Sequence, residues 1–146
     1  MPYKKQFCTF YLDRHFIGIE VEKVQEVIRY QPITPVPLAE EAVRGLINLR
    51  GRIVTAVDLR TPLELPKWAE DQQPMNVILR TEEGGISLLV DEIGDVFDVS
   101  DEDFERPPET LGGAVHDFIR GVYKLNNNLL IALDSEKVVR SFTKSA

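Results

Sequence analysis

The chain has 146 residues, and its 43% hydrophobic and 28% charged residues are a balance typical of a compact globular domain. Its apolar runs fall well short of the roughly 20 residues of a membrane helix, and its N-terminus lacks a signal-peptide pattern, so we expect a cytoplasmic protein without direct membrane insertion. The net charge of −7 argues against nucleic acid as a partner, because phosphate binding relies on Lys and Arg, and the lone Cys8 excludes an internal disulfide.

The sequence predicts a protein built mainly of short β-strands. Apolar residues alternate with polar ones over short runs, and Gly, Pro, Asn and Asp bound these runs, as is typical of strands joined by tight turns. In chain order, strands are expected at residues 6–12, 16–21, 24–30, 46–49, 52–57, 76–80, 86–90, 96–99, 121–125 and 129–133.

The segments between these runs predict loops and little helix. Three prolines make residues 32–37 an extended surface loop, since proline cannot donate to a ladder. Residues 40–44 are compatible with one helical turn, and residues 61–74 and 100–113 with loops. A clear helical pattern occurs only at the C-terminus, where Asp134 or Ser135 can cap a helix whose apolar face is formed by Val138, Val139 and Phe142.

Two stretches of the sequence occur twice, in the same order. Residues 45–58 align without gaps with residues 121–134, each beginning with glycine and ending with aspartate, and residues 17–27 align with residues 86–96. We infer an internal duplication that produces two similar β lobes, too small to be stable separately and packed together with a groove between them. The expected divisions are residues 1–72, 73–134 and, for the C-terminal helix, 135–146.

The residues that usually carry catalysis or metal binding form no recognisable motif. His15 and His116 lie in expected turns or loops without a nucleophile or ligand pattern. The glycine pairs at 84–85 and 112–113 lack the lysine and helix start of a phosphate loop, and the acidic run 101–103 lacks calcium-loop spacing. We therefore expect no enzymatic activity, metal or cofactor.

The turn at residues 48–51 carries a residue that turn chemistry does not explain. Gly51 supplies the turn conformation and Asn48 is expected to bond local backbone, but Arg50 has Asn126 as its counterpart in the second copy. An arginine here suits a protein interface, because its planar fork pairs with carboxylates while its stem covers apolar surface. A solvated side chain is the alternative.

Four motifs resemble the CheW coupling proteins of bacterial chemosensory arrays. They are Val-Gln-Glu-Val at 24–27, Ile-Thr-Pro-Val-Pro at 33–37, Val-Arg-Gly-Leu-Ile-Asn-Leu-Arg-Gly-Arg-Ile-Val at 43–54, and Val-Asp-Leu-Arg at 57–60. The third motif is the most specific, and the resemblance extends over residues 5–139. Val27 stands where many members carry isoleucine, and Thr55-Ala56 replaces a bulkier sequence, so the packing of that strand is expected to differ.

The resemblance implies a mainly β fold of two packed, five-stranded, SH3-like β-barrels with a short C-terminal α-helix, forming a single domain over residues 1–146. It also implies a non-catalytic scaffold. Such a protein couples the cytoplasmic hairpin of a methyl-accepting chemoreceptor to the regulatory domain of a CheA-type histidine kinase, and is recruited to membrane-anchored receptor arrays. The kinase-binding residues are not placed by these motifs.

The resemblance also implies a receptor-binding site. Val24, Glu26 and Arg50 fall where the family's receptor contacts lie, and Val27 and Asn48 are further candidates at the same edge. Apolar side chains would dock a helix stripe, while Glu26 and Arg50 would fix its orientation. Mutual pairing of Glu26 with Arg50 within the fold is the alternative.

Two other functions stay open at this point. The same fold could serve a motility or developmental pathway unrelated to flagella. A small-ligand-binding barrel belongs to a different class, but the sequence names no pocket with convergent polar groups.

Overall fold

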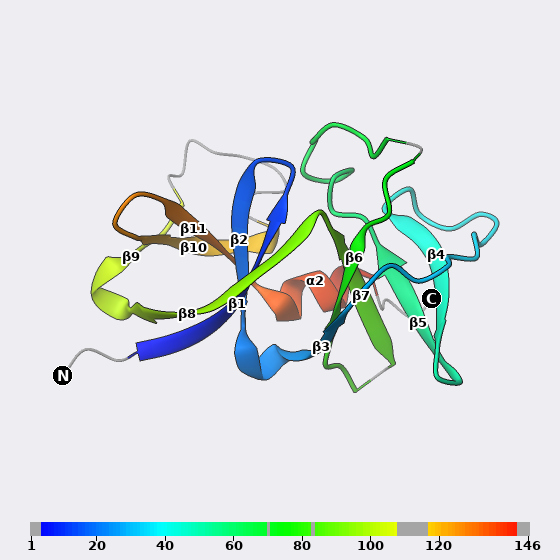
Figure 1. Cartoon of the computed structure of the whole chain (residues 1–146), viewed down its shortest axis with the longest axis horizontal. Coiled ribbons are helices and arrows are strands. Elements are labelled where there is room, and N and C mark those ends of the chain that lie inside the picture. Colours follow the sequence, from blue (N-terminus) through cyan, green and yellow to red (C-terminus); the bar gives the residue numbers. More distant parts are fainter. Residues whose placement is uncertain (1–3, 70, 83, 108–116, 143–146) are drawn as a thin grey trace.

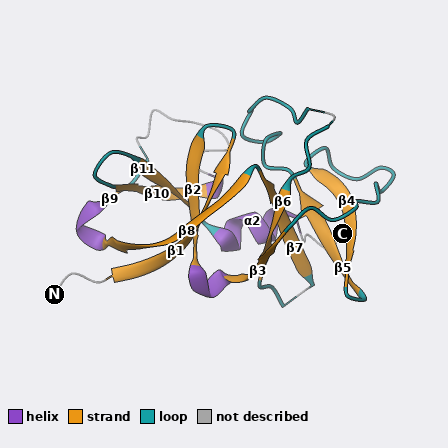
Figure 2. Cartoon of the chain, viewed as in Figure 1, coloured by secondary structure: helices purple, strands orange, loops and turns teal. Residues whose placement is uncertain are grey.

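The computed structural model describes residues 4–69, 71–82, 84–107 and 117–142. Within this part of the chain, strands form two sheets, and one α-helix, α2 (Ser135–Phe142), follows the last strand. Figure 2 shows the strands in two groups with α2 between them. The expected mainly β fold with a C-terminal helix is therefore confirmed. No helix in the described ranges is long and apolar enough to cross a membrane.

The larger sheet closes on itself as a barrel. Its strand order is β8-β1-β2-β11-β10-β9. The bounds are β1 (Lys4–Leu12), β2 (His15–Glu20), β8 (Glu92–Ser100), β9 (Phe104–Glu105), β10 (Ile119–Lys124) and β11 (Leu129–Leu133). The two outer strands, β8 and β9, follow each other in the chain and are joined only by the 3-10 turn Asp101–Asp103. One bent stretch of backbone thus forms both edges of this sheet, which we call barrel A.

The second sheet closes in the same way. Its strand order is β3-β6-β7-β5-β4. The bounds are β3 (Val24–Ile28), β4 (Val43–Leu49), β5 (Arg52–Val57), β6 (Met75–Leu79) and β7 (Gly85–Val90). The chain leaves β3 and, at Thr34, pairs with Leu46 on the opposite edge through two backbone hydrogen bonds of 2.8 Å. We call this sheet barrel B. The two closed sheets are the expected pair of barrels: barrel B has the expected five strands, and barrel A has six because its closing stretch is divided into β8 and the two-residue β9.

The duplication seen in the sequence recurs in the structure at the level of single residues. Gly45 faces Ala56 in the β4–β5 hairpin, and Gly121 faces Ala132 in the β10–β11 hairpin. In both hairpins the register shifts immediately before the glycine. A side chain on either glycine would collide with a backbone carbonyl of the strand that closes the barrel. The glycines at the start of both copies therefore allow this close approach.

The copies of the duplication are not the barrels. Barrel B takes its strands from residues 24–90, and barrel A takes its strands from residues 4–20 and 92–133. Figure 1 shows the mixture, because blue strands from the start of the chain lie in both barrels beside green or orange ones from later in the chain. The sheets thus do not divide at residues 72–73. The chain passes between barrels twice, from β2 to β3 and from β7 to β8.

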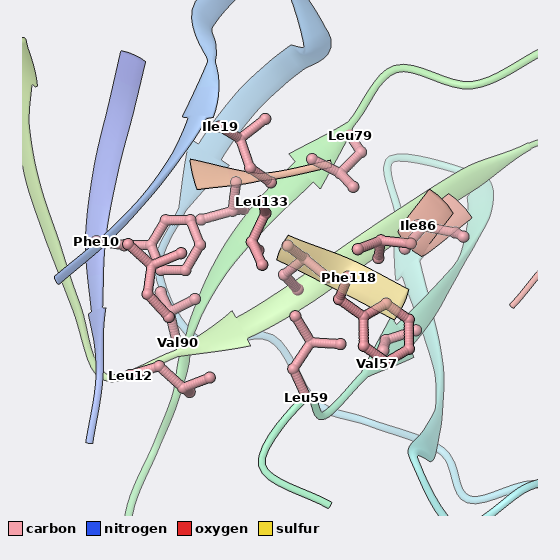
Figure 3. Packing of buried hydrophobic residues seen from close by; sticks show 14 of the residues in the cluster. Phe10, Leu12, Ile19, Val57, Leu59, Leu79, Ile86, Val90, Phe118 and Leu133 are labelled. Atoms are coloured by element: carbon pink, nitrogen blue, oxygen red, sulfur yellow. The ribbon is translucent and has the colours of Figure 1, made fainter. Parts of the chain in front are cut away.

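A continuous apolar core joins the two barrels. Its central cluster takes buried residues from both barrels and from Val138 of α2, which is fully buried. Figure 3 shows side chains such as Phe10, Ile86 and Leu133 converging on this cluster from different strands. Smaller clusters fill the interior of each barrel. Asp134 begins α2 by accepting a hydrogen bond from the Lys137 backbone N–H, as its expected capping role requires.

Local predictions failed in three places. The helical turn expected at residues 40–44 is a turn at residues 41–42, followed at once by β4, because Val43 pairs with Val57. The strand expected at residues 96–99 starts earlier, at Glu92. Part of the loop expected at residues 100–113, namely 108–113, lies outside the described residues; its first part contains the 3-10 turn and β9.

Candidate partner-binding site

The site predicted from the sequence centres on the tight turn between β4 and β5. Arg50 and Gly51 both have positive φ angles, 53° and 89°, which is the type I′ geometry that matches the twist of a hairpin. The Asn48 Oδ1 accepts a hydrogen bond of 2.9 Å from the Gly51 backbone N–H. The turn is thereby fixed by its own residues, and both structural roles expected for Asn48 and Gly51 are confirmed.

Arg50 reaches across to β3 and forms an ion pair. Its Nη2 lies 2.5 Å from the Glu26 Oε2, with 67% of the Arg50 side chain and 25% of the Glu26 side chain exposed. Closure of barrel B brings these residues together, since β3 and β4 are the outer strands of that sheet. The mutual pairing left open by the sequence is what the structure contains. An ion pair with this exposure adds little to the free energy of unfolding. Either side chain can therefore pair with another charge at little cost in free energy.

The other predicted residues of β3 lie apart from this pair. The ladder between β3 and β6 shifts between Val24 and Glu26, so that Val24 and Val27 face one side of the strand and Glu26 the other. Val24 is 8% exposed and packs in the central core, whereas Val27 is 43% exposed. The structure thus groups Glu26, Asn48 and Arg50, puts Val27 on the opposite face of β3, and buries Val24.

Several exposed apolar residues were not singled out in the sequence. Ile53, 58% exposed, lies directly opposite Asn48 on β5. The repeat alignment makes Leu129 the counterpart of Ile53 and Val96 the counterpart of Val27, and these two residues are 53% and 56% exposed. Exposed apolar side chains therefore recur at equivalent positions in the two barrels. Comparing the repeats position by position was the signal that could have identified them.

The remaining candidate chemistry in the described residues is sparse. Cys8 is a free thiol whose pKa is raised by burial, which makes it a poor nucleophile near neutral pH. His15 is exposed but is the first residue of β2 rather than part of the expected turn, and His116 lies outside the described residues. The acidic run at residues 101–103 forms the turn between β8 and β9, and no cluster of potential metal ligands occurs within the described ranges. The strongest feature on the surface is thus the Glu26–Arg50 pair on its rigid turn.

Comparison with known proteins identifies relatives over nearly the whole chain. The family model for the CheW-like domain matches residues 6–143. The chemotaxis protein CheW of Treponema pallidum (strain Nichols) is 31% identical over 140 residues, which cover 93% of this chain and 82% of that protein. The chemotaxis protein CheW of Thermotoga maritima is 30% identical over 140 residues, covering 94% and 89%.

A solved structure is similar as well. The scaffolding protein TtCheW from Thermoanaerobacter tengcongensis superimposes with a TM-score of 0.80 at 26% sequence identity, covering 92% of this chain and 90% of the other. The similarity therefore includes both barrels and their arrangement.

Proposed function

The chain belongs to the CheW-like family, and we propose that it is a non-catalytic chemotaxis scaffold. In this proposal it couples the cytoplasmic hairpin of a methyl-accepting chemoreceptor to the regulatory domain of a CheA-type histidine kinase. It would act in the cytoplasm, at arrays of membrane-anchored receptors. Support comes from the relatives named chemotaxis protein CheW and from the similar structure named a scaffolding protein.

The observation that carries the receptor-binding part is the exposed Glu26–Arg50 pair. Arg50 is held at a left-handed backbone position that disfavours most residues other than Gly, Asn and Asp, and its counterpart is Asn126. An arginine at such a position is not explained by the turn, and the pair adds little stability. A role in binding accounts for it, because each partner of the pair can turn to an opposite charge on a docked helix.

Apolar contacts would accompany the charged pair. Ile53, exposed opposite Asn48 on β5, can supply an apolar contact for a docked helix. Val27 is exposed on the face of β3 opposite Glu26, so it can extend that surface around the outer strand of barrel B. Val24 is buried, so we assign it to holding β3 from the core side rather than to direct contact. Asn48 contributes by fixing the turn that presents Arg50.

The test removes the charge and leaves the turn intact. Arg50→Asn keeps a residue suited to the positive φ angle, so the variant should fold as well as the wild type. We expect its affinity for a soluble receptor-tip hairpin, measured by calorimetry, to fall about tenfold, as loss of a charged interface contact commonly does. Its affinity for the kinase regulatory domain should not change.

A matched control removes a partly exposed, ion-paired arginine from the other barrel. Arg120 forms an ion pair with Glu20 at 2.6 Å, with 39% of its side chain exposed. Arg120→Asn should leave receptor binding unaltered. Unaltered receptor affinity of Arg50→Asn would remove Arg50 from the interface, whereas a wild-type protein that binds neither partner would refute the scaffold function itself.

A further inference from the structure

The chain divides into two halves, neither of which contains a complete barrel. The N-terminal half comprises β1 to β5, and the C-terminal half comprises β6 to β11 and α2. Barrel A contains β1 and β2 from the N-terminal half, and barrel B contains β6 and β7 from the C-terminal half. Each half thus contributes a two-stranded hairpin to one barrel and the rest of the strands to the other.

The halves are joined by strand pairing in both barrels. In barrel A the seams are β1 with β8, antiparallel, and β2 with β11, parallel. In barrel B they are β3 with β6, antiparallel, and β5 with β7, parallel. The two sets of seams correspond under the duplication, since β2 pairs with β11 as β7 pairs with β5. The arrangement is that of a strand-exchanged dimer whose two subunits have been fused into one chain.

The central core is shared almost equally between the halves. The N-terminal half supplies Phe10, Leu12, Ile17, Ile19, Val24, Val57 and Leu59. The C-terminal half supplies Val77, Leu79, Ile86, Leu88, Val90, Phe118, Leu133 and Val138. An interface with this composition resembles a domain core cut in two, which is the character of obligate dimers.

A single connector, residues 58–74, links the halves between β5 and β6. The last part of this connector makes few contacts with the rest of the protein. Up to Trp68 the connector is anchored, because Arg60 is buried against Asp91 and Trp68 packs on the core. Beyond it, Asp71, Gln72 and Gln73 are exposed. The connector around Asp71, Gln72 and Gln73 is therefore the place where the chain can open without loss of a seam or of the core.

From these observations we propose that a second copy of this chain can replace either half. In the resulting half-exchanged dimer, the N-terminal half of one copy completes both barrels with the C-terminal half of the other. Every seam and the Arg60–Asp91 pair reform, now between copies, and only the path of the connector around residues 71–73 changes. The monomer is favoured at low concentration because the connector keeps its own halves at high effective concentration. This inference does not rest on the proposed function.

Complementation between two full-length variants tests the exchange. Gly45→Val places a side chain against the Thr34 carbonyl and damages the N-terminal half, and Gly121→Val does the same against Glu105 in the C-terminal half. Each variant refolded alone should remain unfolded. When the two are unfolded, mixed and refolded, the intact N-terminal half of one and the intact C-terminal half of the other should form one native unit per dimer.

The readouts are dispersed amide signals in NMR and the mass from light scattering. We expect up to half of the wild-type folded signal, in a species of twice the monomer mass, with a yield that rises with protein concentration. The matched control mixes Gly45→Val with Gly18→Trp, whose side chain would collide with Leu130. Both lesions lie in the N-terminal half, so no intact unit can form. A Gly45–Gly121 mixture that folds no better than this control overturns the proposal.

A second measurement covers the case in which one variant folds alone. A specific protease site in place of residues 69–73 allows the connector of the full chain to be cut after folding. Cut protein should stay together, and refolding a mixture of isotope-labelled and unlabelled cut protein should give mixed pairs of halves at the statistical ratio. Separation of the halves on cutting, or failure to form mixed pairs, overturns the proposal.

Discussion

At the scale of single residues, Gly45 tests how strictly barrel closure depends on close backbone approach. Gly45 has a φ of 149°, and a side chain there would collide with the Thr34 carbonyl, whereas Gly51 has a φ of 89° and open space around it. We expect Gly45→Ala to lower the free energy of unfolding by about 2–4 kcal/mol, from strain and collision together. Gly51→Ala should cost about 1 kcal/mol, from backbone strain alone. Urea unfolding curves measure both, and equal losses would contradict the role of the Thr34 contact.

The predicted site shows which features of a binding site residue patterns can predict and which they cannot. Arg50 stood out in the sequence because its counterpart is Asn126, and the structure places it on an exposed turn, paired with Glu26. The resemblance placed Val24 with Glu26 among the receptor contacts, and residues two apart in a regular strand share a face. The register shift in β3 breaks that alternation and turns Val24 into the core. Such a shift depends on pairing with β6, which is distant in the sequence.

At the scale of elements, the Arg60–Asp91 pair joins two segments of the chain. Arg60 lies in the connector between β5 and β6, and Asp91 lies where the chain passes from β7 of barrel B to β8 of barrel A. Both Asp91 oxygens lie 2.8 Å from the Arg60 Nη2, and the Asp91 Oδ2 also accepts a hydrogen bond from the Asp13 backbone N–H. Arg60 is stacked 4.1 Å from the centre of the Trp68 ring, and its side chain is only 5% exposed. The pair thus ties three segments together in a water-poor environment.

We expect Asp91→Ala to destabilise the protein by about 3–5 kcal/mol, because it leaves the buried Arg60 charge without a counter-ion. Arg60→Met combined with Asp91→Leu should recover most of this loss, since no charge then stays buried. Arg120→Ala, at an exposed pair, should cost less than about 1 kcal/mol. The measurement is urea unfolding followed by Trp68 fluorescence. Similar losses for Asp91→Ala and Arg120→Ala would show that the buried pair is no more important than a surface one.

Most strands could be predicted because their apolar alternation and turn residues are local. The turn at residues 50–51 and strand β5 were predicted to the residue, since a two-residue turn with glycine sets its own register, whereas β4 begins earlier than expected, at Val43. The expected helical turn at residues 40–44 was wrong because pairing of Val43 with Val57 outweighs the intrinsic helix preference of the Glu and Ala residues before it. The start of β8 was missed because its pairing with β1, rather than its composition, makes it a strand.

At the scale of the whole molecule, the duplication predicted two similar lobes, but not that the copies exchange hairpins. Sequence similarity identifies which residues correspond, and it does not say with which copy each strand pairs. The parallel pairs β2–β11 and β5–β7 join residues from different copies, and no local pattern specifies them. The predicted boundary at residues 72–73 therefore coincides with the division into halves and not with the division into barrels.

This exchange of hairpins predicts that the barrels unfold together. Unfolding barrel B alone would unfold β3 to β7 and would expose the shared core that barrel A also covers. Amide signals of Ile47, inside barrel B, and Leu130, inside barrel A, should therefore disappear at the same urea concentration. Gly45→Ala, which acts in barrel B, should shift both midpoints equally. If the barrels were independent units, only the Ile47 signal would move, and the interlocked core could not be what holds them in a fixed relation.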